Sequence, residues 1–176
     1  MAGPMSLEGV RVLDLSWYIA GPICGKILAD HGAEVIKIES EATLDPTRPA
    51  GAWLHGVNTA PDGGMTFTHF NRNKLGATLN LKSDEGRRLF LELVRKSDVV
   101  LDNYTAGTME RLGLGYDVLR EANPGIVMAE LSGLGQTGPY RSYVAFGMTL
   151  MALSGGYELT GDPDGPPVMP GYTYPD

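Results

Sequence analysis

The sequence predicts an α/β fold, an open and mostly parallel sheet of Rossmann type with flanking helices. Two observations carry this prediction. Residues 10–39 have the pattern strand, helix, strand, which is a β-α-β unit of ordinary length. Between residues 76 and 133, short predicted strands alternate again with segments of helical spacing. Because a crossover helix joins parallel strands of one sheet, the alternation indicates a doubly wound fold.

The first unit begins with the apolar run VRVLDLS at 10–16, a predicted strand. A helix is expected from Pro22 to His31. Proline suits the first helical turn, and Gly32 suits the end of the helix. The run AEVIKIE at 33–39 then predicts the second strand.

Residues 41–66 are rich in Pro, Gly and Ala and show no sustained period, so a long loop is expected there. GATLNL at 76–81 predicts the next strand. The helix after it, at 83–97, has Ser83 as a plausible N-cap, and its apolar face is expected to hold Leu89, Leu93 and Val94.

The rest of the chain continues the alternation with a strand at 98–104, a helical segment at 107–123, a strand at 125–133 and a short helix at 148–153. Residues 1–147 are therefore predicted to form a Rossmann-like ligand-binding part. Residues 148–176 are predicted to be a helix and a Gly/Pro-rich loop, with too little regular structure to be a domain.

Composition excludes several classes of function. The net charge is -7 and no Lys/Arg run is long enough to follow a phosphate backbone, so no nucleic-acid partner is expected. No run approaches the roughly 20 apolar residues of a membrane span, so no membrane partner is expected. The single cysteine, Cys24, favours a reducing compartment, and no signal region precedes the first strand. The expected location is the cytoplasm.

Metal and nicotinamide chemistry find little support. The histidines His31, His55 and His69 are scattered, and no cluster of ligand residues accompanies them, so no metal site is expected. Cys24 lies among apolar residues and is expected to be a small buried hydrophobe. No G-x-G-x-x-G is present, which disfavours a nicotinamide enzyme.

Ligands of open parallel sheets bind outside the carboxyl ends of the strands. Four predicted loops meet there: SWYIAGP, ESEATLDPTR, DNYTAG and SGLGQTGPY. The helix opened by Gly21 and Pro22 could hold an anion, or could simply start after a strand. SGLGQTGPY could cover a ligand or merely connect two elements. By composition alone, Asp176 would be a solvated terminal acid.

The order of the sequence blocks is more specific. GVRVLDLS, AGP, LADHGAEVIKIE, DPTR, NRNK, LNLKSDEGR, DNY, MERLGLGY, NP, SGLGQTGPY and LTGDPDGPP follow one another along the chain. This series resembles the family III CoA-transferases, a superfamily that includes formyl-CoA transferase, carnitine CoA-transferase and α-methylacyl-CoA racemase. The resemblance implies the N-terminal part of the large domain of an interlocked homodimer. The small domain and the returning C-terminal segment are not expected in this chain.

The resemblance also implies a nucleophile. In the transferases an aspartate stands nine positions beyond the second proline of D-G-P-P, and counting from Pro167 gives Asp176. In the family this carboxylate attacks an acyl-CoA thioester and passes through a mixed anhydride and an aspartyl-CoA thioester. The substrates implied are an acyl-CoA and a carboxylic acid, with no metal. The activity implied is acyl-CoA:carboxylic acid CoA transfer.

Contacts to coenzyme A carry over by position. The resemblance assigns them to the loop after the first strand, to LNLK, to NYT and to the arginine of MERLG: Ile19, Ala20, Leu79, Asn80, Leu81, Lys82, Asn103, Tyr104, Thr105 and Arg111. Lys82 and Arg111 suit the CoA phosphates as counter-charges. Both residues also suit an ordinary protein surface.

Some positions depart from the family pattern. A polar residue such as Gln is common where Ile19 stands, and Ser40 replaces an arginine of some transferases, with Arg48 a possible substitute. NYTAG departs from the commoner Asn-Phe-Arg-Pro-Gly. Val144 and Gly147 stand where formyl-CoA transferases place more functional side chains.

The sequence leaves two alternatives to a transferase. The racemases of this superfamily carry Gly-His-Asp before the ALSG segment, whereas this chain has Ala145, Phe146 and Gly147. Racemisation needs a base on each face of the α-carbon, so the missing histidine favours transfer. The other alternative is an inactive CoA-binding fragment, and the isolated 176-residue chain is expected to be catalytically silent.

Overall fold

A computed structural model describes residues 3–48 and 64–171. Its sheet has five strands, all parallel, in the order β3-β2-β1-β4-β5. The strands are β1 Arg11–Asp14, β2 Glu34–Glu39, β3 Leu75–Thr78, β4 Val99–Asp102 and β5 Val127–Glu130. The predicted open parallel α/β fold is confirmed, and the order matches the first five strands of the doubly wound fold.

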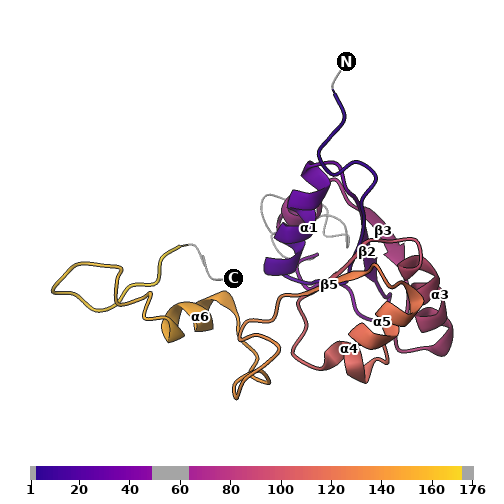
Figure 1. Ribbon diagram of the computed structural model, residues 1–176. Helices are drawn as coiled ribbons and strands as arrows, with labels where there is room; N and C mark the ends of the chain where they lie inside the picture. Colours follow the sequence, from indigo (N-terminus) through magenta and orange to yellow (C-terminus); the bar gives the residue numbers. More distant parts are fainter. Residues whose placement is uncertain (1–2, 49–63, 172–176) are drawn as a thin grey trace.

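Helices cover both faces of the sheet (Figure 1). Their bounds are α1 Ala20–Asp30, α2 Met65–Asn71, α3 Asp84–Val94, α4 Thr108–Arg111, α5 Tyr116–Ala122 and α6 Gly147–Leu153. α1 lies on one face with α2 beside it, and α3 packs with α5 on the other. After β5 the chain leaves the sheet, and α6 lies to one side of the layered body (Figure 1).

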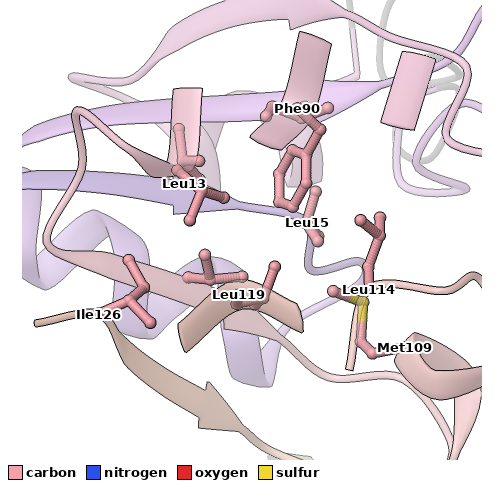
Figure 2. Close-up of a cluster of buried hydrophobic side chains, with 10 residues drawn as sticks. Leu13, Leu15, Phe90, Met109, Leu114, Leu119 and Ile126 are labelled. Atoms are coloured by element: carbon pink, nitrogen blue, oxygen red, sulfur yellow. The ribbon is translucent and has the colours of Figure 1, made fainter. Parts of the chain in front are cut away.

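The main core lies between the sheet and the α3, α4 and α5 side. Figure 2 shows Leu13 and Leu15 from the β1 region facing Phe90 of α3 and Leu119 of α5. All four side chains are fully buried. Each such side chain stabilises the fold by about 1.5–3 kcal/mol through the apolar area it removes from water.

The buried face of α3 differs from the prediction. Gly86, Phe90 and Val94 are buried, whereas Leu89 is 38% exposed and Leu93 is partly buried. Gly86 fixes this face, because a Cβ there would lie 1.9 Å from the Asn80 carbonyl oxygen. Residues four apart then share the buried side. Ser83 is the N-cap as predicted, and its Oγ accepts from the Gly86 N–H.

Three predicted elements need correction. The expected loop at 41–66 ends in a helix that the prediction lacked, α2. The strand predicted at 76–81 occupies Leu75–Thr78, because the chain turns at Asn80, whose Oδ1 accepts from the Lys82 N–H. The helical segment predicted at 107–123 is two helices, since Gly113 has a φ of 72°, in the left-handed region.

Candidate functional site

A cleft of about 670 Å³ opens at the carboxyl ends of the strands. β1 and β4 are neighbours in the sheet but are followed by crossovers that run in opposite directions, so the strand order reverses between them. Ligands of open α/β sheets bind at this switch point. The cleft is lined by residues 17–18, 20, 38–40, 43, 79–82, 103–105, 108, 112, 131–133, 143–146 and 150.

Most of the residues predicted to contact CoA meet in this cleft. They come from three separate loops and are Ala20, Leu79, Asn80, Leu81, Lys82, Asn103, Tyr104 and Thr105. Ile19 does not line the cleft. It is the half-buried N-cap of α1, and its carbonyl accepts from the Ile23 N–H. Asp176 lies outside the described residues.

Arg111 is also absent from the cleft wall. Its guanidinium donates to the Thr108 Oγ1 at 2.7 Å and to the Ala106 carbonyl oxygen at 3.4 Å. Thr108 itself lines the cleft, so the exposed Arg111 contacts a residue of the cleft wall without lining the cleft. A bound anion would have to draw it forward from these two acceptors.

Asn103 joins the two loops at the switch point. Its Oδ1 accepts from the Trp17 N–H at 2.8 Å, and its Nδ2 donates to the Trp17 carbonyl oxygen at 2.7 Å. The Trp17 ring meets the Tyr104 ring edge-on, with centroids 5.8 Å apart. These two hydrogen bonds of the Asn103 side chain hold the two loops together.

Two buried ion pairs support the loops from below. The Lys74 Nζ lies 2.7 Å from the Asp14 Oδ2, and the Lys37 Nζ lies 3.1 Å from the Asp45 Oδ2. Lys37 also donates to the Ser16 carbonyl oxygen at 2.6 Å. Neither pair was predicted from the sequence, since each joins residues that only the folded loops and strands bring together.

Asp45 reaches the cleft through Tyr18. Its Oδ1 accepts from the Tyr18 N–H at 3.4 Å and from the Thr47 N–H at 2.9 Å. Tyr18 has a φ of 64°, a left-handed conformation that is costly for a residue with a Cβ. Asp45 therefore helps to hold a strained residue in the wall, and such strain is found mostly at functional sites.

Arg48, the possible substitute for the arginine replaced by Ser40, is engaged elsewhere. Its guanidinium pairs with Glu39, with the Nε to Oε1 distance at 3.0 Å, and stacks 3.9 Å from the Phe67 ring centroid. Ser40 lines the cleft and Arg48 does not. Burial pushes the pKa of Glu39 upward, but hydrogen bonds from Arg48 and the Asp45 N–H outweigh it, so that the pKa lies below its ordinary value.

The far wall of the cleft is apolar. The Tyr18 ring meets the Phe146 ring edge-on at 5.4 Å, and Phe146 is the N-cap of α6. Leu150, one turn further on, lines the same wall. Gly133 brings the loop after β5 against this segment, since a Cβ there would lie 2.9 Å from the Ala145 Cβ.

The histidines and the cysteine do not form a reactive cluster in the part of the chain that the structure describes. His31 is the C-cap of α1 and His69 is exposed on α2, while His55 lies outside the described residues. Burial, and then the Asp14 carboxylate, raise the pKa of the Cys24 thiol, which opposes a nucleophilic role. Within residues 3–48 and 64–171 no group of three or more His, Cys, Asp or Glu is arranged to hold a metal.

Asp102 is a buried acid that the sequence did not single out. It is 1% exposed at the end of β4, its Oδ1 accepts from the Tyr104 N–H at 2.9 Å, and its Oδ2 has no hydrogen-bond partner among the described residues. Burial, opposed by the Tyr104 N–H and assisted by Glu130 and Glu110, raises its pKa to about 7. No sequence signal distinguishes it from an ordinary strand-end acid.

Replacing Asp102 by asparagine is expected to change the pH dependence of stability. Between pH 4 and 7 the folded wild type holds a proton on Asp102 that the unfolded chain releases, so this group makes the wild type less stable as pH rises. As pH rises from 4 to 8, Asp102→Asn should therefore gain roughly 3–4 kcal/mol in stability relative to the wild type, because the folded pKa of about 7 stands far above the ordinary value of 3.8. Urea unfolding at both pH values measures this, and a pH-independent difference would contradict it.

Comparisons with known proteins place these features in a family. The model of the family described as CoA-transferase family III matches residues 7–176. An acyl-CoA transferase of Fusarium pseudograminearum is 46% identical over 94% of this chain and 37% of its own length. Succinyl-CoA--D-citramalate CoA-transferase of Chloroflexus aurantiacus is 42% identical, over 98% of this chain and 42% of its own length.

Solved structures agree. A CAIB/BAIF family protein from Brucella suis superposes with a TM-score of 0.87 at 33% identity, over 98% of this chain and 45% of its own. The protein Rv3272 from M. tuberculosis, in its orthorhombic form, gives a TM-score of 0.86 at 35% identity, over 98% and 47% of the two chains. The chain spans about two fifths of the length of the curated relatives it matches. With a model match over nearly its whole length, the chain belongs to CoA-transferase family III.

Proposed function

We propose that this chain supplies the CoA-binding part of an acyl-CoA:carboxylic acid CoA-transferase. The observation that carries the proposal is the cleft at the β1–β4 switch point, where three separate loops bring together eight residues that the family resemblance assigns to CoA. Its substrates are an acyl-CoA and a carboxylic acid. Relatives named for succinyl-CoA and for acetyl-CoA with oxalate support this class.

The proposed chemistry uses Asp176 as the acyl carrier. Its carboxylate attacks the thioester carbonyl and the C–S bond breaks. CoA leaves as a thiolate, and the acyl group remains on Asp176 as a mixed anhydride. The thiolate then attacks the aspartyl carbonyl of the anhydride. This step forms an aspartyl-CoA thioester and releases the donor acid. The acceptor carboxylate repeats the two steps in reverse, so that CoA ends on the acceptor and Asp176 is regenerated. No net redox change and no metal is needed.

The described residues contribute binding and orientation. Asn103 and Asp45 fix the peptides of Trp17 and Tyr18, two residues that line the cleft. Lys82 supplies a positive charge at the cleft for a CoA phosphate. Arg111 stands behind Thr108 as a second counter-charge.

The apolar wall supports transfer over racemisation. Phe146 stands where the racemases of the superfamily carry the histidine base, and its ring packs on Tyr18. A phenyl ring cannot accept a proton, so one of the two bases that racemisation needs is missing. α-Proton exchange into deuterated water without CoA transfer would contradict this preference.

Other parts of the proposal extend beyond the described residues. We infer an interlocked homodimer in the cytoplasm, with residues 1–147 as the CoA-binding part and 148–176 leading to the catalytic aspartate. Exposed apolar side chains in the later segment support a protein partner there, because Leu153 is 66% exposed and Leu159 87%. Among the described residues no helix is long and apolar enough to cross a membrane.

The test is a transfer assay on the complete gene product, meaning the protein as its own gene encodes it. Succinyl-CoA or acetyl-CoA is mixed with oxalate, malate or citramalate, and the acyl-CoA products are separated by mass. We expect the acceptor's CoA ester to form only when donor, acceptor and protein are all present. CoA binding with no transfer for any pair would favour the inactive CoA-binding alternative.

Lys82→Ala is expected to weaken CoA binding. The exposed ammonium loses one charge-assisted contact with a phosphate, so the Kd for CoA should rise about 5- to 10-fold, or about 1 kcal/mol. Titration calorimetry measures it. Lys96→Ala, a change of the same kind at an exposed residue beyond α3 and outside the cleft, should leave the Kd unchanged. Equal effects of the two variants would contradict the assignment.

A further inference from the structure

Arg87, in the first turns of α3, reaches back to the loop that precedes its own helix. Its Nη1 donates to the Lys82 carbonyl oxygen at 3.0 Å and to the Leu81 carbonyl oxygen at 3.4 Å. Its Nη2 pairs with the Asp84 carboxylate. The turn between α4 and α5 is nearby, since a Cβ built on Gly113 would come within 3.9 Å of the Arg87 Cδ. The guanidinium is thus bonded both to the loop and to the first turn of its own helix.

The rest of this loop is fixed by its own hydrogen bonds. The Asn80 carbonyl oxygen accepts from the Ser83 N–H at 3.0 Å and from the Ser83 Oγ at 2.8 Å. The Asn80 Oδ1 accepts from the Lys82 N–H at 3.1 Å. These bonds use the N–H groups of Lys82 and Ser83. Arg87 serves the carbonyl side, where it donates to two successive peptides.

Those two peptides belong to the wall of the cleft. Leu79, Asn80, Leu81 and Lys82 all line it, whereas Arg87 does not. We propose that Arg87 is a positioning residue, which holds the Leu81 and Lys82 peptides in the conformation that binds CoA. The inference rests on the proposed function, because it takes CoA as the ligand of this cleft.

The neighbouring arginine offers a matched control. Arg88 lies on the same helix and pairs with Glu85, also three residues before it, through two bonds of 2.9 and 2.7 Å. Its side chain is 58% exposed and makes no bond to the loop. Exposed pairs of this kind contribute little to stability. Comparing the two arginines therefore separates the loop contacts from a charge on α3.

The experiment uses Arg87→Ala, Arg87→Lys and Arg88→Ala in the complete gene product. Titration calorimetry gives the Kd for CoA, and steady-state kinetics gives KM for the acyl-CoA and kcat. For Arg87→Ala we expect the Kd and the KM to rise about tenfold and kcat to stay within twofold, while Arg88→Ala matches the wild type. Arg87→Lys should remain at least threefold weaker than the wild type, because one ammonium cannot reproduce the planar fork.

A double-mutant cycle with Lys82→Ala provides a readout that a merely structural role would not move. If Arg87 acts by placing Lys82, Lys82→Ala should raise the Kd for CoA clearly less in the Arg87→Ala background than in the wild type. Additive effects, full recovery by Arg87→Lys, or equal Kd values for Arg87→Ala and Arg88→Ala would each overturn the proposal. Failure of the wild type itself to bind CoA would instead overturn the proposed function.

Discussion

Asp176→Asn in the complete gene product is expected to lower the rate of CoA transfer at least roughly 10³-fold, the scale of losses when a catalytic nucleophile is removed. The amide cannot attack a thioester to form an anhydride, so both covalent intermediates are lost. The Kd for CoA should change little, because the proposed CoA contacts lie on other residues. Steady-state transfer rates and calorimetric Kd values measure the two effects separately.

Asp164→Asn is the matched control, since Asp164 is an exposed acid of the same Gly/Pro-rich segment. We expect it to keep wild-type activity. A tenfold or smaller loss in Asp176→Asn would show that the carboxylate is not the acyl carrier. Equal losses in both variants would point to a general effect of charge in the segment.

Lys74→Met is expected to destabilise the fold by about 3–5 kcal/mol, the usual cost of leaving one member of a buried ion pair alone. Its Nζ lies 2.7 Å from the Asp14 Oδ2 and also donates to the Pro22 carbonyl oxygen and the Asn71 Oδ1, both at 2.9 Å. Asp14 is completely buried, so water cannot replace the lost ammonium. Urea unfolding at pH 7 measures the loss.

A control at a second lysine and a double variant test whether the buried ion pair causes this loss of stability. Lys26→Met removes an ion pair to Asp30, at 3.5 Å and partly exposed, and should cost less than about 1 kcal/mol. Combining Lys74→Met with Asp14→Asn should recover more than half of the lost free energy, because the lone buried charge disappears. A double variant as unstable as Lys74→Met alone would contradict the ion-pair explanation.

The sequence predicts the sheet well because local signals specify its parts. β1, β2 and β4 lie in mainly apolar runs and are largely buried, as expected for strands covered on both faces. Ser83 marks the start of α3, and Gly32, with a φ of 102°, marks the end of α1. Where a signal was weaker, the prediction failed: α2, in the sequence MTFTHFN, follows a long Pro/Gly-rich stretch and has no capping side chain.

The candidate site could be predicted only in part. The family resemblance led to Leu79–Lys82 and to Asn103–Thr105, and the structure brings both segments to one cleft. The groups that hold them were not predicted. Asp45 and Arg87 act through backbone atoms of Tyr18, Leu81 and Lys82, and such contacts depend on loop conformations that residue spacing does not specify.

Asp102 was not predicted either, because its environment also depends on contacts that the folded structure creates. Asp102 is buried only in the folded protein, and Glu130 becomes its neighbour only when β5 pairs with β4 in the observed register. Ile19 is the opposite case. The resemblance predicts it as a contact residue, but as the N-cap of α1 it does not line the cleft.

The central claim is that CoA moves between acids through an acyl intermediate on Asp176. The most direct test is to incubate the complete gene product with an acyl-CoA, quench with hydroxylamine, and map the modified peptides by mass spectrometry. We expect one hydroxamate, at Asp176, which is absent without acyl-CoA and absent from Asp176→Asn. Active transfer with an unmodified Asp176, or a hydroxamate at another residue, would contradict the account.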